Sequence, residues 1–151
     1  MKVLVDTNVI LDFFLSREPF VTEAKQVFKM IRSKEVVACV SANSVTDIYY
    51  VISKRLHDEF ARNAIRHILE AFAVIAVDGD DCGYALDLPM ADFEDALIAV
   101  CAGKEDIQYI ISNDKEFSQT NAKAAAVASS RDFLDLYKIS NQRRNNNRQT
   151  Q

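Results

Sequence analysis

Four aspartates, Asp6, Asp47, Asp95 and Asp114, stand where apolar runs end or helical patterns begin. Acids spread this widely along a chain can converge at one edge of a folded α/β sheet. Carboxylates that lie close together repel one another and raise each other's pKa unless a cation neutralises them. Hard oxygen ligands of this kind favour Mg²⁺ or Mn²⁺. The chain is therefore a candidate metal-dependent enzyme.

The first and last of these acids should end strands. Asp6 directly follows the apolar run at 3–5, and Asp114 follows Ile110-Ile111 through two small polar residues. Ligands of open α/β sheets bind at the carboxyl ends of strands, and a topological switch between the first and fourth strands would make these two acids neighbours. We therefore expect Asp6 and Asp114 to lie side by side.

The other two acids should lie on helices. The segment 41–44 offers N-capping residues, so Asp47 is expected in or near the first turn of a helix. A second helical block covers 92–101 and ends near Gly103, with Asp92 and Asp95 on one face and apolar side chains on another. Asp92 and Asp95 should therefore point together, close to the positive end of the helix dipole.

Capping is the alternative role for each of these acids, because aspartate is common at helix starts and in turns. For any one of the four alone, capping would be favoured, and only their convergence indicates chemistry. Asp12 is intermediate, since it follows Asp6 by six residues on an early helix. It could support the site from outside the metal ligands or be an ordinary surface acid.

Short apolar runs alternate with segments of helical spacing along the chain. This pattern is typical of βαβ units with a mostly parallel sheet that is covered on both faces. The predicted strands are Lys2–Val5, Val36–Val40, Val74–Val77, Gln108–Ser112 and Lys123–Ala128, although the last run could equally continue a helix. The length of 151 residues and 49% hydrophobic content suit one domain with one core.

Net charge, cysteine content and the lengths of the apolar runs indicate where in the cell the protein is expected. The formal net charge of -4 argues against binding nucleic acid by overall charge, although a local basic rim remains compatible with it. Three widely spaced cysteines indicate neither a disulfide framework nor a zinc site, which fits a reducing cytoplasm. The N-terminal apolar run is too short for a signal peptide, and no run approaches the length of a membrane span. We expect a cytoplasmic protein without a membrane segment.

The C-terminal residues differ from the rest of the chain in composition. The domain is expected to span 1–138, and the polar, basic segment 139–151 is expected to be disordered. Arg143, Arg144 and Arg148 could help to hold RNA phosphates, but a solvated tail is the commoner role for such a segment.

Four sequence blocks together resemble the PIN-domain nuclease family. They are DTNVILD at 6–12, SANSVTDIYY at 41–50, DFEDALIA at 92–99 and SND at 112–114, and they occur in the family's order. The resemblance extends from Met1 to about Tyr137. It implies a three-layer α/β/α sandwich, a Mg²⁺- or Mn²⁺-dependent ribonuclease, and kinship with the toxins of type II toxin–antitoxin pairs.

The resemblance also implies roles for individual residues. Carboxylates equivalent to Asp6, Asp47, Asp95 and Asp114 form the catalytic site, and Asp6, Asp95 and Asp114 would hold the metal. The family commonly has glutamate where this chain has Asp47, so this shorter acid could bind the metal through water. Further positions match an additional acid and supporting polar residues of the family: Asp92, Thr7, Asn8, Ser112 and Asn113.

Binding of RNA at an acidic site would need nearby cations. Lys54, Arg55 and Lys115 are the candidates, with Arg17 and Arg62 behind them, and ordinary surface charge is the equal alternative. The bound ion would polarise a phosphate oxygen and activate a water for attack on phosphorus. The resemblance further implies a small antitoxin that covers the cleft, and toxin dimers.

Two other functions remain open from the sequence. One is a catalytically silent PIN-like module that binds RNA or a protein through the same cleft. The other is a phosphate-handling α/β domain in which an aspartate at a strand end accepts phosphate. The block Asp6-Thr7-Asn8 fits this second function poorly, because it lacks the paired aspartate of a dehalogenase-type nucleophile loop.

Overall fold

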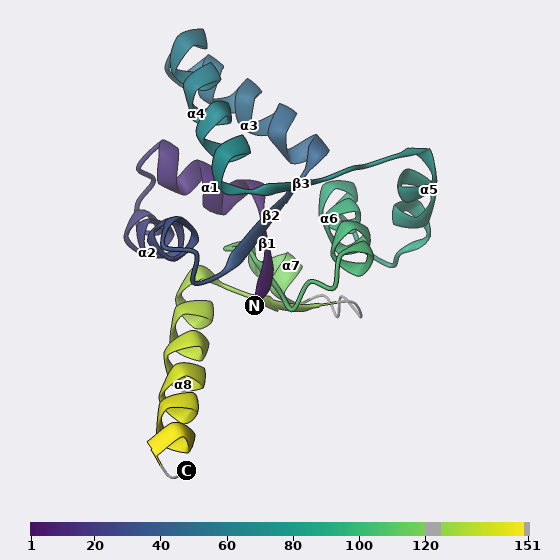
Figure 1. The fold of residues 1–151 in the computed structure, drawn as a ribbon. Helices are drawn as coiled ribbons and strands as arrows, with labels where there is room; N and C mark the ends of the chain where they lie inside the picture. The colour runs from purple at the N-terminus through teal and green to yellow at the C-terminus, as the bar shows by residue number, and fades with distance from the viewer. Residues whose placement is uncertain (120–124, 150–151) are drawn as a thin grey trace.

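The computed structural model describes residues 1–119 and 125–149, which form a parallel sheet with helices on both faces (Figure 1). The strands are β1 (Lys2–Val5), β2 (Val37–Ser41), β3 (Ala73–Ile75), β4 (Tyr109–Ile111) and β5 (Ala126–Ala128). Their order is β3-β2-β1-β4-β5, and every neighbouring pair is parallel. The predicted neighbourhood of the first and fourth strands is confirmed, with Val5 beside Ile111.

The helices over the described residues cover the sheet in two layers. They are α1 (Thr7–Phe14), α2 (Val21–Arg32), α3 (Ala42–Arg55), α4 (Asp58–Ala71), α5 (Gly79–Asp87), α6 (Phe93–Lys104), α7 (Lys115–Gln119) and α8 (Ser130–Gln149). Helices α1 to α4 lie on one side of the sheet, and α5 and α6 lie on the other (Figure 1). The predicted three-layer α/β/α arrangement is therefore confirmed.

Alternation along β1 explains why the sheet has two covered faces. Val3 and Val5 are fully buried in the core that α1 to α4 share with the start of α8, whereas Leu4 is buried against α6 and α7. Successive side chains of a strand point to opposite faces, so an entirely apolar strand needs cover on both sides. Burial on both faces fixes the register of β1 and thus the position of Asp6 directly after it.

The predicted strands are confirmed with small shifts at their ends. Residues 2–5 match without change, whereas the third strand begins one residue before Val74 and ends two residues before Val77. The ambiguous last run is a strand over Ala126–Ala128, and residues 123 and 124 of that prediction lie outside the described residues. None of the helices described here has the length and apolar character that crossing a bilayer requires.

The C-terminal segment differs from its prediction. Residues 139–151 were expected to be disordered, but α8 continues from Ser130 to Gln149 and projects from the body (Figure 1). Residues 150 and 151 of that prediction lie outside the described residues. Extending an existing helix by one residue costs little, and arginine and glutamine are good helix formers. The helix crosses residue 138 without a break, so a domain boundary there stays a prediction.

Candidate active site

Asp6 lies at the carboxyl end of β1, in the position where the sheet edge meets α1. Its backbone N–H donates to Ile111 of β4 at 3.0 Å, and its carbonyl accepts hydrogen bonds from Val9 and Ile10 of α1. The residue is only 4% exposed. Asp6 is therefore held by the strand on one side and by the helix start on the other, with its side chain inside the protein.

Two polar side chains orient the Asp6 carboxylate. The Ser112 hydroxyl donates to Oδ2 of Asp6 at 2.7 Å, and the side-chain amide of Asn8 donates to the same oxygen. Asn8 also donates to Ser112 at 3.2 Å and accepts from the backbone N–H of Asn113 at 3.1 Å. The first and last sequence blocks thus meet as predicted, in one network across the ends of β1 and β4.

Asn113 connects this network to two further elements. Its side-chain N–H donates to Asp12 of α1 at 2.9 Å, and its side-chain oxygen accepts from the backbone N–H of Ser130 at the start of α8 at 3.0 Å. Asp12 is 4% exposed, so it is a buried partner of Asn113 and not the surface acid that was the alternative. The sequence prediction left both roles open, and the structure favours the supporting one.

Asp114 caps the short helix α7 at the same edge of the sheet. Its Oδ1 accepts from the backbone N–H of Glu116 at 2.7 Å, and its own N–H donates to the Ser112 hydroxyl at 3.1 Å. Its charge contributes to raising the pKa of both Asp6 and Asp95. Asp114 therefore combines the capping role with a position in the acidic site.

Asp92 and Asp95 occupy different positions at the start of α6. Asp92 is the N-cap, and its Oδ1 accepts from the backbone N–H groups of Glu94 at 2.8 Å and Asp95 at 3.2 Å. Asp95 lies half-buried in the first turn, near enough to Asp6, Asp92 and Asp114 for their charges to act on its carboxylate. One oxygen of Asp92 is thus committed to the helix end, whereas Asp95 lies with Asp6 and Asp114 at the sheet edge.

The pKa values of the two acids show that negative charge is crowded here. Burial raises the pKa of Asp6 to about 6, the hydrogen bond from Ser112 opposes this, and the charges of Glu94 and Asp114 add to it. Burial also raises the pKa of Asp95 to about 7, followed in size by the repulsion from Asp6. A positive charge between these acids would relieve the repulsion and favour their ionised forms.

Glu94 belongs to the site, and the sequence analysis missed it. The Thr7 hydroxyl donates to its Oε1 at 2.9 Å, and burial raises the pKa of Glu94, with further repulsion from Asp47 and Asp92. Its place directly before Asp95 in the first turn of a helix was the signal that could have identified it. The charge of Asp47, on the second turn of α3, contributes to the raised pKa of Glu94, so these two acids lie near each other.

The acids fit a divalent cation in kind but are not arranged around one. Carboxylate oxygens are the donors that Mg²⁺ and Mn²⁺ prefer. Across residues 1–119 and 125–149, no three acidic, histidine or cysteine side chains stand together with the spacing of metal ligands. Binding an ion would thus require the carboxylates of Asp6, Asp95 and Asp114 to move closer together than they lie in this structure.

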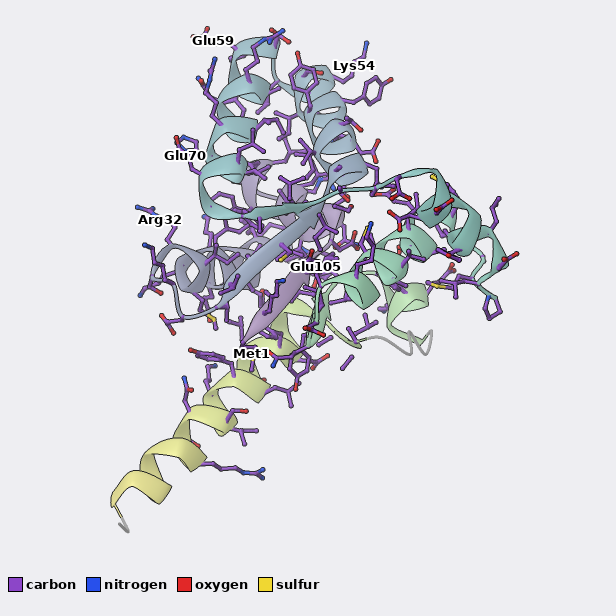
Figure 2. All side chains as sticks on the ribbon, turned by 45° about the vertical axis from the view of Figure 1, so that its right-hand side comes forward. Met1, Arg32, Lys54, Glu59, Glu70 and Glu105 are labelled. Carbon is purple, nitrogen blue, oxygen red and sulfur yellow. The ribbon has the colours of Figure 1, made fainter. Side chains whose placement is uncertain are left out.

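The predicted basic contacts separate into two groups. Lys54 lies at the outer end of the α3–α4 pair, with its amino group 5.6 Å from the centre of the Tyr50 ring (Figure 2). Arg55 instead lines a pocket of about 500 Å³ together with Arg17 and Asp114. The structure therefore places Arg55 and Arg17 beside the acids, and Lys54 away from them. Lys115 begins α7, directly after Asp114.

Comparisons with known proteins agree with this geometry. The PIN domain family model matches residues 2–116. Ribonuclease VapC1 of Aquifex aeolicus is 31% identical over 121 residues, which cover 77% of this chain and 83% of that protein.

Solved structures share the fold. VapBC2 of Rickettsia felis, bound to a DNA fragment from its promoter, has a TM-score of 0.66 at 15% identity, covering 85% of this chain and 98% of that one. Mycobacterium tuberculosis VapC20, a sarcin–ricin loop cleaving toxin, has 0.64 at 22% identity, covering 77% and 92%. A toxin–antitoxin complex from Klebsiella pneumoniae has 0.61 at 21% identity, covering 85% and 97%. With the family model and the Aquifex relative together, the chain belongs to the PIN-domain family.

Proposed function

We propose that this protein is a metal-dependent endoribonuclease that hydrolyses phosphodiester bonds of RNA. The observation that carries the proposal is the pair formed by buried Asp6 and half-buried Asp95, whose pKa values are raised to about 6 and about 7 at the edge where β1 and β4 end. Uncompensated acids of this kind cluster at functional sites. The name of the Aquifex relative supports a ribonuclease in particular.

Asp6, Asp95 and Asp114 would hold Mg²⁺ or Mn²⁺, with Asp47 and Glu94 next to them. A bound ion would supply Lewis acid chemistry, by polarising a phosphate oxygen and lowering the pKa of a bound water. Ser112 and Asn8 both donate to Oδ2 of Asp6 and so orient the carboxylate that would bind the ion. The Thr7 hydroxyl orients the Glu94 carboxylate in the same way.

Asp47 and Glu94 are the acids left to act on water or to bind a second ion. Glu94 carries a raised pKa and lies close enough to Asp47 for their charges to interact. A carboxylate that is not itself committed to the metal can accept a proton from the attacking water. We assign this pair to the catalytic side of the site, and Asp92 to capping and orienting α6.

The experiment that tests the function compares cleavage of a mixed tRNA and rRNA pool by the wild type and by Asp6→Asn, each with Mg²⁺, Mn²⁺ or EDTA. Discrete cleavage by the wild type that needs both the ion and Asp6 is the expected result. Asp80→Asn is the matched control, because Asp80 is an exposed acid on α5 and should leave cleavage unchanged. Equal inactivity of wild type and Asp6→Asn with every ion, after removal of any bound partner, would favour an RNA- or protein-binding module instead.

We further propose that the protein is the toxin of a toxin–antitoxin pair. The similarity to the Klebsiella pneumoniae toxin–antitoxin complex and to VapBC2 of Rickettsia felis supports a small protein partner. Growth arrest on expression of the wild type, relieved by co-expression of the neighbouring small gene product and absent for Asp6→Asn, is the expected outcome. A homodimer stays a prediction, which light scattering of the purified protein can check.

A further inference from the structure

Two adjoining pockets lead away from the acidic site along the α1–α2 connection. The first, of about 500 Å³, includes Asp114, Arg17 and Arg55, and the second, of about 390 Å³, includes Ser130 at the start of α8. Phe20 and Asn113 line both pockets. Because the pockets share these two residues, they adjoin each other, and we call the two together the Phe20 groove.

We propose that the Phe20 groove binds single-stranded RNA beside the bond to be cleaved. Arg17 and Arg55 contact the phosphate backbone, and Phe20 stacks on an unpaired base. The inference rests on the proposed nuclease function, because the groove starts at Asp114 and would guide the strand toward the acids. It names the kind of RNA bound and the residues that bind it.

The first pocket supplies positive charge where the acids alone would repel phosphate. Arg17 is partly buried in the α1–α2 connection, and its charge acts on the buried carboxylate of Asp12. Arg55 comes from the C-terminal end of α3 and is exposed. Planar guanidinium groups form paired hydrogen bonds with phosphate, so two arginines from different elements can hold one backbone segment.

Phe20 offers an apolar face at the junction of the two pockets. Its side chain is 42% exposed although the residue stands directly before α2, whose own apolar side is buried. Bases of single strands and loops can splay out and stack on aromatic rings, which paired bases cannot do. An exposed ring that lines both pockets, the first of them together with two arginines, therefore favours an unpaired strand over a duplex.

The second pocket contains a buried hydroxyl that a base could satisfy. Ser130 is 1% exposed, and its Oγ has no hydrogen-bond partner within the described part of the chain. A buried polar atom without a partner costs free energy that a ligand can return. Glu23 in this pocket is paired with Arg131 at 2.6 Å, so the acid there is already neutralised. The pocket can thus accept the polar edge of a base without unopposed negative charge.

The test measures binding of a labelled, mixed-sequence, single-stranded RNA by fluorescence anisotropy in EDTA, where no cleavage needs to occur. Phe20→Ala should weaken binding by ~10-fold, in line with the loss of one base stack. Phe20→Tyr should keep the affinity, because it keeps the ring. Tyr84→Ala is the matched control, since Tyr84 is an exposed aromatic residue on α5.

Charge variants test the phosphate contact separately. Arg55→Gln should weaken binding and reduce the slope of log K against log salt by ~0.7, the value for one phosphate contact on a single strand. Glu18→Gln removes a negative charge from the same pocket and should strengthen binding. Arg66→Gln, on the exposed side of α4, should change neither the affinity nor the slope.

The outcomes separate this inference from the nuclease proposal. Unchanged RNA binding in both Phe20→Ala and Arg55→Gln, together with metal-dependent cleavage by the wild type, would overturn the Phe20 groove and leave the nuclease standing. Equal affinity for duplex and single-stranded RNA would also overturn it. Binding that depends on Phe20 in a protein that cleaves nothing would support the groove while refuting the nuclease.

Discussion

Replacing Asp6 with asparagine should stabilise the protein without metal while abolishing its chemistry. The buried carboxylate has a pKa of about 6 in the fold, mainly because of burial, against about 3.9 for an unfolded aspartate. Between these values the native state binds more protons than the unfolded state. Stability therefore falls as the pH rises through this window, and the full cost is present above pH 6.

The size of the effect follows from this difference in pKa. Ionising Asp6 inside the fold costs roughly 3 kcal/mol at neutral pH. Asparagine keeps one oxygen to accept the hydrogen bond from Ser112, but loses the extra strength of a bond to a charged acceptor. We therefore expect a net gain of about 1–2 kcal/mol for Asp6→Asn in EDTA at pH 7.5. The melting temperature should rise by roughly 3–6 °C for a chain of this size.

The assay is thermal unfolding of the wild type and Asp6→Asn in EDTA between pH 3.5 and 8, repeated with saturating Mg²⁺. The advantage of the variant should grow as the pH rises from about 4 to about 6 and stay level above it. Mg²⁺ should raise the melting temperature of the wild type and not that of the variant, because an ion that binds only the folded wild type stabilises it by mass action.

One result would refute this reasoning. If Asp6→Asn in EDTA melts below the wild type at pH 7.5, and the difference does not change toward pH 4, ionised Asp6 is not a burden on the fold. The charge of Asp6 would then be compensated within the protein itself, and the argument that the site needs a cation would lose its main support.

Three further predictions concern the residues around Asp6. Mg²⁺ affinity, measured by calorimetry, should increase from pH 6 to pH 8, because Asp95 with its pKa of about 7 must lose a proton to bind the ion. An affinity that is flat over this range would contradict the assignment of Asp95 as a ligand. Ser112→Ala should lower Mg²⁺ affinity by roughly 10-fold through the loss of its hydrogen bond to Asp6, whereas Ser53→Ala, which removes a hydroxyl far along α3, should not. Thr7→Val should lower kcat several-fold with little change in stability, since the Thr7 hydroxyl holds Glu94. Thr7→Ser should keep kcat at the wild-type value, and equal kcat values for the two variants would count against a role for this hydrogen bond.

Local patterns predicted the sheet edge well, because the physical cause was local. The apolar strand β1 is buried on both faces, so its end could be located from the sequence to the residue, and Asp6 with it. The meeting of Asp6 with Ser112 followed once β1 and β4 were taken as neighbours. An uninterrupted apolar run must be buried and a polar residue after it marks the end of the strand, so the sequence leaves few alternative positions for that end.

The parts of the site that the sequence did not predict depend on how each helix is rotated about its axis, which a local pattern does not fix. Which side of α6 faces β1 is set by packing, so the sequence did not identify Glu94, which the structure brings to Thr7. That Asp92 and Asp95 point together stays a prediction, and one oxygen of Asp92 caps α6. Likewise, Lys54 and Arg55 are adjacent in sequence, yet a helical step of about 100° turns them toward different surroundings.

The hydrogen bond between Thr7 and Glu94 shows that the first sequence block, 6–12, positions an acid on α6 as well as Asp6. Asp6 is positioned by the strand that precedes it, Asn8 orients that carboxylate, and Thr7 reaches across to α6. Three consecutive residues at one strand end therefore set the positions of two acids that are 88 residues apart in number, Asp6 and Glu94. A short polar turn can do this only because β1 is central in the sheet, with helices on both sides of its end. The same three residues on an edge strand would have a neighbouring strand on one side only. The order of the strands, which places β4 with Ser112 beside β1, is therefore as necessary to this site as the acids themselves.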